Sequence, residues 1–158
     1  MTLKYIKTCF FLLVLSGLTF SSCYKESDWL GDNTTTEGKH FPVIAGFELV
    51  TEGGPFSEGT SVQLDLDFWS LDAISSIKLY ERVDGGDPVE VASFGYTANF
   101  QDDSQTDELI MSYTIPSLPA DTVQITLDAE VVNENGLTRN TKDGDTSNRP
   151  SITFTAVK

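Results

Sequence analysis

Basic residues, histidine and cysteine are scarce in this sequence. It has one histidine, two cysteines and 10 lysines and arginines against 24 aspartates and glutamates, for a formal net charge of −14. Such an acidic chain does not bind nucleic acid or an anionic lipid surface by charge, because both are polyanions. The chain also lacks a His-Glu-x-x-His motif, a Gly-x-Ser-x-Gly elbow, a P-loop and a Gly-x-Gly-x-x-Gly loop. With His40 as its single histidine, we expect a protein that is not an enzyme.

A long apolar run is missing as well. The run nearest the start, Cys9 to Phe20, has 12 residues, whereas a helix needs roughly 20 to cross a bilayer. Two lysines precede this run and two serines follow it. A positive start, a short apolar stretch and small residues after it are the marks of an export signal. We therefore predict that residues 1–22 are a signal peptide that is removed.

The residues at the end of this signal, Phe20-Ser21-Ser22-Cys23, resemble the lipobox of bacterial lipoproteins. The resemblance implies that the Cys23 thiol receives a diacylglycerol and that the new amine is acylated with a fatty acid such as palmitate. Cys9 leaves with the signal, so no internal disulfide can form. Two or more acyl chains hold a protein firmly on a membrane. The alternative is an ordinary cleaved signal in which Cys23 has no special role.

Residues 23–40 show no apolar period and are rich in glycine, threonine and charge. We predict that they form a lipidated, flexible tether. Its first residues, Tyr24-Lys25-Glu26-Ser27-Asp28, resemble the export signal of Bacteroidota surface lipoproteins. That resemblance implies a lipid-anchored protein of the outer membrane that faces the cell exterior; the alternative is that it faces the periplasm. Removal of the signal takes two lysines with it, so the mature chain carries a net charge of −16.

From residue 41 on, apolar residues recur at every second position, which is the period of a strand with one face buried. The clearest case is VQLDLDF at residues 62–68, where apolar residues alternate with glutamine and aspartates. Further strands are predicted at residues 41–50, 74–83, 89–94, 109–115, 123–131 and 152–156. We therefore predict an all-β domain at residues 41–158, a single antiparallel β-sandwich of about seven strands.

The stretch from Leu118 to Ile125, continued by Asn133-Glu134-Asn135-Gly136, resembles the late strand pair of fibronectin-type-III and related immunoglobulin-like domains. The resemblance implies an immunoglobulin-like sandwich. Together with the anchor, the chain resembles small accessory lipoproteins of Bacteroidota, including the immunoglobulin-like modules of surface glycan-uptake systems. Such a likeness concerns the fold, and function has to be argued from a site.

Aromatic residues outside the apolar alternation are candidates for ligand binding. Flat rings stack on sugar faces and bury the C–H surface while the hydroxyls stay hydrated. The candidates are Trp69, Tyr80, Tyr96 and Phe100. The alternative is that they are single exposed aromatics, which are common on protein surfaces.

Two loops are rich in acids and are candidate calcium sites, because calcium takes carboxylate and carbonyl oxygens as ligands. The candidate ligands are Asp102, Asp103 and Asp107 in one loop, and Asp143 and Asp145 in the other. Calcium is the cofactor that these residues suggest, although neither loop has the EF-hand pattern. The alternative is a solvated acidic loop without any cofactor.

We therefore expect a non-catalytic cell-surface lipoprotein that acts as a binding or scaffold module. Its expected partners are a glycan or a surface transporter and lipoprotein complex, in an accessory role in glycan uptake. The alternative is a structural or adhesive subunit that works through protein contacts, with or without calcium. Several aromatic rings on one face would favour the first function, and a bare acidic face or an unpaired edge strand would favour the second.

Overall fold

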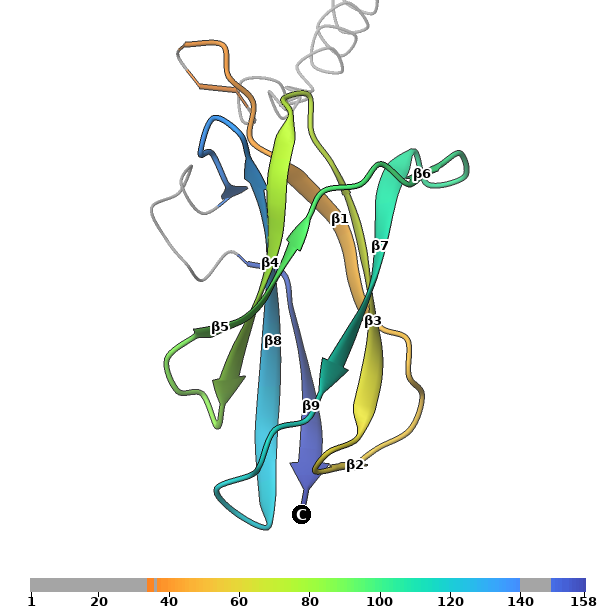
Figure 1. Ribbon diagram of the computed structural model, residues 1–158, viewed down its shortest axis with the longest axis vertical. Coiled ribbons are helices and arrows are strands. Elements are labelled where there is room, and N and C mark those ends of the chain that lie inside the picture. Colours follow the sequence, from red (N-terminus) through yellow and green to blue (C-terminus); the bar gives the residue numbers. More distant parts are fainter. Residues whose placement is uncertain (1–33, 36, 140–148) are drawn as a thin grey trace, which may run out of the picture. The chain divides into compact units, whose positions relative to one another are not determined.

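The computed structural model describes residues 34–35, 37–139 and 149–158 of the chain. The chain divides into two compact units, Met1–Asp32 and Asn33–Lys158, and the described residues all belong to the second. This unit is all-β, and its strands form two sheets (Figure 1). Within the described ranges, no helix is long and apolar enough to cross a membrane.

The first sheet has four antiparallel strands. In spatial order these are β1 (Val43–Leu49), β3 (Ser61–Trp69), β7 (Thr106–Thr114) and β6 (Phe100–Gln101). β6 pairs with only the first two residues of β7. The Glu108 N–H also donates to the Asn99 carbonyl, so β7 is an edge of this sheet from Leu109 on.

The second sheet has five strands. In spatial order these are β2 (Phe56–Ser57), β9 (Ser151–Val157), β8 (Thr122–Asn133), β4 (Ile74–Val83) and β5 (Val89–Gly95). The pairs are antiparallel except for β2, which runs parallel to β9. A tight turn with positive φ at Asp84 and Gly85 joins β4 to β5, and β5 is the last strand of its sheet.

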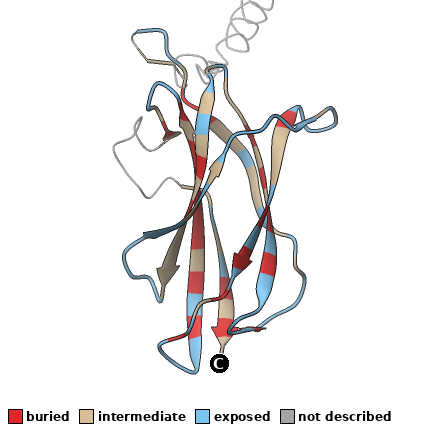
Figure 2. Ribbon diagram, viewed as in Figure 1, coloured by how far each residue is buried: buried red, intermediate tan, exposed pale blue. Residues whose placement is uncertain are grey.

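The core lies between the two sheets and follows the predicted alternation. In β3, Val62, Leu64 and Leu66 have no exposed surface, and the alternating residues Gln63, Asp65 and Asp67 lie on the outer face. In β8, Ile125 and Leu127 are likewise fully buried. Burying one such side chain stabilises the fold by about 1.5–3 kcal/mol. Figure 2 shows the resulting bands of buried and exposed residues along the long strands.

The seven longer strands lie where the sequence pattern predicts them. The pattern does not predict β2 and β6, because two residues are too few to show an alternation. The parallel pairing of β2 with β9 also departs from the predicted, wholly antiparallel arrangement. The structure is therefore an all-β, sandwich-like fold with two additional short strands.

Candidate functional site

The four predicted aromatic residues do not share one face. Trp69 ends β3 in the four-stranded sheet and is half-buried, whereas Tyr80 lies on β4 in the five-stranded sheet. Tyr96 and Phe100 come from the connection between β5 and β6 and from β6 itself. These residues therefore come from two sheets and from the connection between β5 and β6, and only Tyr96 and Phe100 lie near each other in the chain.

Tyr80 is covered by an arginine. The guanidinium carbon of Arg149 lies 3.7 Å from the centroid of the Tyr80 ring, on the outer face of the five-stranded sheet. The Tyr80 hydroxyl donates a hydrogen bond of 2.9 Å to Glu130, and Arg149 forms a 3.4 Å ion pair with the same carboxylate. Burial, followed by the bond to Glu130, raises the pKa of the Tyr80 phenol. This ring is therefore part of a structural network rather than a free binding surface.

Neighbouring residues extend this network along the sheet. Arg82 donates two hydrogen bonds of 2.8 and 2.6 Å to Asp128, which is only 3% exposed. Lys78 forms a 3.0 Å ion pair with Glu90 on β5. The bond to Asp128 raises the pKa of Arg82, and the bond to Glu90 raises that of Lys78. The alternation in the sequence indicates an outward face here, but it does not reveal that the acids of β8 are covered.

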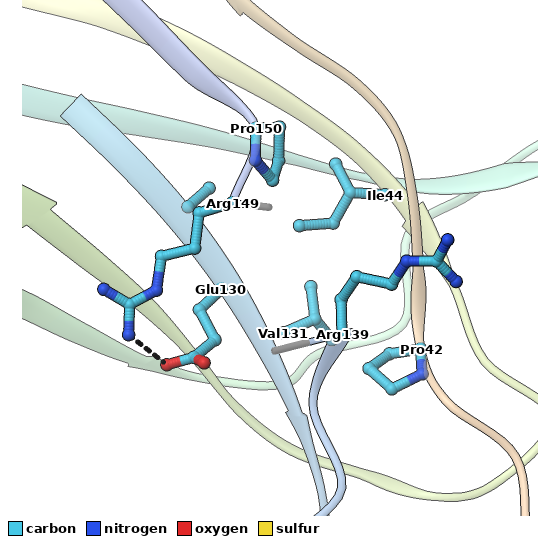
Figure 3. A pocket seen from close by; sticks show the side chains of 8 residues that line it. Pro42, Ile44, Glu130, Val131, Arg139, Arg149 and Pro150 are labelled. Atoms are coloured by element: carbon cyan, nitrogen blue, oxygen red, sulfur yellow. Dashed lines mark hydrogen bonds and ion pairs between the residues drawn. The ribbon is translucent and has the colours of Figure 1, made fainter. Parts of the chain in front are cut away.

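A small pocket lies beside this network (Figure 3). Its free volume is about 10 Å³, enough for about one water molecule. Its lining residues are Pro42, Ile44, Ala129, Glu130, Val131, Arg139, Arg149 and Pro150. In Figure 3 the guanidinium of Arg149 points to Glu130, and that of Arg139 points the opposite way. The pocket is thus lined by side-chain stems and is too small for a metabolite.

Tyr96 bridges the two sheets on the side where β5 and β7 lie. Its ring packs edge-on against Phe68, with centroids 6.2 Å apart, and its hydroxyl donates to Asp107 over 2.9 Å. The backbone N–H of Asn99 donates to the same carboxylate over 2.8 Å. Phe100, in contrast, is 57% exposed. Of the four aromatics, Phe100 presents the largest exposed fraction.

The aspartates of the first acidic loop differ in their hydrogen bonds and in their exposure. Asp107 is occupied by Tyr96 and Asn99, whereas Asp102 and Asp103 are exposed in the turn between β6 and β7. In the part of the chain that the structure describes, no group of three acidic, histidine or cysteine side chains is arranged to hold a metal ion. The second predicted pair, Asp143 and Asp145, lies outside the described residues.

A row of carboxylates crosses the outer face of the four-stranded sheet. Glu48 faces Asp65 in the register of β1 and β3, and Asp67 faces Glu108 in that of β3 and β7. Burial raises the pKa of Asp65, and the three neighbouring carboxylates raise it further. Asp65 Oδ1 is buried and has no hydrogen-bond partner. The sequence indicates that both aspartates of β3 point outward, but it does not bring Glu48 and Glu108 beside them.

The residue that ends the predicted tether is bound to the domain. The His40 backbone N–H donates to Asp72 over 2.7 Å, and its ring Nδ1 lies 3.3 Å from the same carboxylate. Asn133, 1% exposed, donates to the His40 carbonyl over 3.0 Å. Asn135 donates to Asp72 over 2.9 Å. The chain is therefore held to the domain just before β1, while the predicted lipidation site Cys23 lies outside the described residues.

Exposed apolar side chains gather on one side of the domain. Of the seven large hydrophobic residues exposed in the described ranges, five lie between positions 89 and 110: Val89, Val91, Tyr96, Phe100 and Ile110. We call these five residues the apolar rim. β1 contacts β8 and β9 across the core, so the opposite ends of the two sheets, β5 and the pair β6–β7, lie on the same side. The sequence alone does not reveal this rim, because the rim depends on which strands are edges.

Comparisons with known proteins add little. No family model and no curated protein matches the chain. It is similar to wild-type OgpA from Akkermansia muciniphila, with a TM-score of 0.48 and 14% identity over 80% of this chain and 32% of OgpA, about a third. It is also similar to a Niemann-Pick type C2 protein from Japanese carpenter ant, with a TM-score of 0.40 and 11% identity over 76% and 94%. The CARDB domain of PF1109 from Pyrococcus furiosus gives a TM-score of 0.38 and 15% identity over 74% and 93%. Likenesses this distant carry no argument about function.

Proposed function

We propose that this chain is a lipid-anchored, non-catalytic surface protein with an immunoglobulin-like domain that works through protein contacts. One observation carries the proposal: Trp69 and Tyr80 lie apart from each other on different sheets, whereas five exposed apolar residues, Tyr96 and Phe100 among them, belong to the apolar rim beside two strand edges. A protein surface is a suitable partner for such a rim, because it would cover apolar side chains that are otherwise exposed to water.

The proposed anchor is the acylated Cys23, on the strength of the lipobox resemblance. Residues 24–28 favour the exterior face of the outer membrane. In this setting the domain is an accessory or structural subunit of a surface complex, and a glycan-uptake complex is the one that the family resemblance favours. Sugar binding would then belong to other subunits. The only role that the proposal leaves for calcium is to support the contact with the partner protein.

The test uses the native host with a tag after Lys158. Whole cells are treated with external protease, membranes are separated, and the tagged protein is crosslinked and captured. We expect the wild-type protein to be membrane-bound, cleaved from outside and recovered with a surface protein. Cys23→Ala should lose membrane attachment, and Ser22→Ala, which keeps a small residue before the cysteine, should behave as wild type.

Three outcomes separate the alternatives. Protection from external protease would show that the protein faces the periplasm. Capture of no protein, together with binding to a glycan panel, would contradict a function through protein contacts. Loss of the partner on adding a chelator, and its return with calcium, would identify the contact as calcium-dependent.

A further inference from the structure

We propose that the free edge of β5 is a docking site for an extended segment of a partner protein, which adds to the five-stranded sheet as a sixth strand. The expected segment alternates apolar and basic residues. This inference rests on the proposed function, since it names the surface and the chemistry of the protein contact.

The first observation is the position of β5. Within the described part of the chain β5 pairs with β4 alone, and no strand lies on its other side. The backbone groups on that side are therefore available to another chain. Edge strands of this kind accept an incoming strand through main-chain hydrogen bonds, while alternate side chains provide selectivity.

The second observation is the character of the β5 side chains. Val89 is 61% exposed and Val91 is 43% exposed, whereas Ala92 and Phe94 pack against the core. Natural edges are commonly protected by a lysine or a proline, and the sequence of β5, VEVASFG, contains neither. The pairing of β4 with β5 does contain a bulge. Its register shifts between Leu79 and Tyr80 of β4, and Val91 of β5 has no partner residue there. We therefore expect the added strand to pair most regularly with the four residues that follow the bulge, 92–95.

The third observation decides the charge of the partner. No lysine or arginine occurs between Arg82 and Arg139. In the segment from β5 to β7 and the hairpin before it, every charged residue is an acid. These residues are Asp84, Asp87, Glu90, Asp102, Asp103, Asp107 and Glu108. The nearby ammonium group of Lys78 is already paired with Glu90. A basic segment is therefore attracted to this side, because complementary charge steers association and suppresses wrong partners.

The same charges disfavour pairing between two copies of this chain. An antiparallel β5–β5 contact would place two acid-rich segments side by side, in a chain whose net charge is −14 with its signal attached. Like charges brought together across an interface are repulsive. A partner of opposite charge is thus the occupant that the observations favour.

The experiment uses the full lipidated chain in detergent micelles and a synthetic nine-residue peptide of alternating valine and lysine. A matched peptide of alternating valine and glutamate is the charge control. Binding is measured by fluorescence anisotropy, and hydrogen exchange locates the protected amides. We expect the basic peptide to bind, to protect amides mainly among residues 92–95 of β5 and to lose affinity in salt. The acidic peptide should not bind.

The variant V89K/V91K places two lysines on the exposed edge without touching the core. Its affinity for the basic peptide should fall about tenfold or more, because like charges then face each other. V50K/L71K is the matched control, since Val50 and Leu71 are 46% and 61% exposed and lie outside the apolar rim. It makes the same change in charge and should leave β5 protection and most of the affinity intact.

Several results would overturn the inference. These are protection spread over the acidic outer face rather than β5, equal losses in the two double variants, or a concentration-dependent dimer whose crosslinks join β5 to β5. Native capture separates this inference from the proposed function. If V89K/V91K still captures the partner that wild type captures, the function stands and the β5 site is wrong. If wild type captures no protein, the proposed function itself fails.

Discussion

The guanidinium carbon of Arg149 lies over the ring of Tyr80, 3.7 Å from its centroid. Tyr80 belongs to β4 and Arg149 lies two residues before the start of β9, and β8 separates these two strands in the sheet. The arginine therefore reaches across β8, where Glu130 binds both side chains. This contact joins three strands and removes Tyr80 from the binding surface that the sequence suggested.

Arg149→Ala is expected to lower the free energy of unfolding by about 1–3 kcal/mol, because the buried Glu130 would lose its ion pair with Arg149 and Tyr80 would lose the guanidinium over its ring. Tyr80→Phe removes only the hydroxyl bond to the same carboxylate and should cost about 1 kcal/mol. Urea unfolding followed by circular dichroism measures both changes. Stability of Arg149→Ala equal to wild type would show that the network contributes nothing to the fold.

Asp65→Asn is expected to stabilise the protein at neutral pH. Burial and three neighbouring carboxylates raise the pKa of Asp65 above its ordinary value of 3.8. The folded state therefore binds this proton more tightly than the unfolded chain, and ionisation above the raised pKa costs stability. The melting temperature at pH 7 should rise by about 2–4 °C, and this gain should shrink as the pH falls through the raised pKa of Asp65 and be absent below 3.8.

Asp103→Asn is the control for Asp65→Asn, because it removes the same charge from an exposed turn. It should shift the melting temperature by less than about 1 °C, as surface changes usually do. A gain of equal size in both variants would mean that relief of net charge, rather than the environment of Asp65, is the cause. Scanning calorimetry across the pH range distinguishes the two.

Asp72→Ala should release the chain before β1, because the carboxylate accepts bonds from both the backbone and the ring of His40. Trypsin cleavage after Lys39 should then become about tenfold faster, as expected when a local contact opens. Mass spectrometry of timed digests gives the rates. Asp87→Ala, in the exposed β4–β5 turn, should leave them unchanged. An unchanged rate in Asp72→Ala would show that other contacts hold this segment.

Acid should release the same contact only at low pH. The hydrogen bond from the His40 backbone N–H, the largest of several contributions, lowers the pKa of Asp72 below 3.8. The ionised carboxylate therefore stabilises the folded state above pH 3.8, and this contribution is lost as the pH falls through the lowered pKa. The protection of the amides around His40 against hydrogen exchange should persist at pH 3.8 and be lost only as the pH falls through the lowered pKa of Asp72.

Two neighbours on β7 test the assignment of its faces. Met111 is 1% exposed and belongs to the core, whereas Ile110 is 48% exposed on the apolar rim. Met111→Ala should destabilise the protein by about 2–5 kcal/mol, and Ile110→Ala should change stability by less than about 0.5 kcal/mol. Urea unfolding again gives both values. A large cost at Ile110 would mean that this side chain is part of the core and is unavailable to a partner.

The sequence by itself determined the strands and which side of most of them is buried. Its alternation of apolar and polar residues places Val62, Leu64 and Leu66 inward and the aspartates of β3 outward. This succeeds because the side chains of a strand point to alternate faces, so one buried face leaves a period of two. The predicted anchor at Cys23 likewise depends on local sequence alone and stays a prediction.

Only the tertiary structure decided which strands are edges and which outward side chains are covered. Strand order brings Arg149 onto Tyr80 and leaves β5 unpaired, although Val89 and Tyr80 show no such difference in their local pattern. The reason is physical: pairing and coverage depend on contacts between residues far apart in the chain. A two-residue period indicates that one face of a strand is buried. It does not indicate which segment covers that face or pairs with that strand.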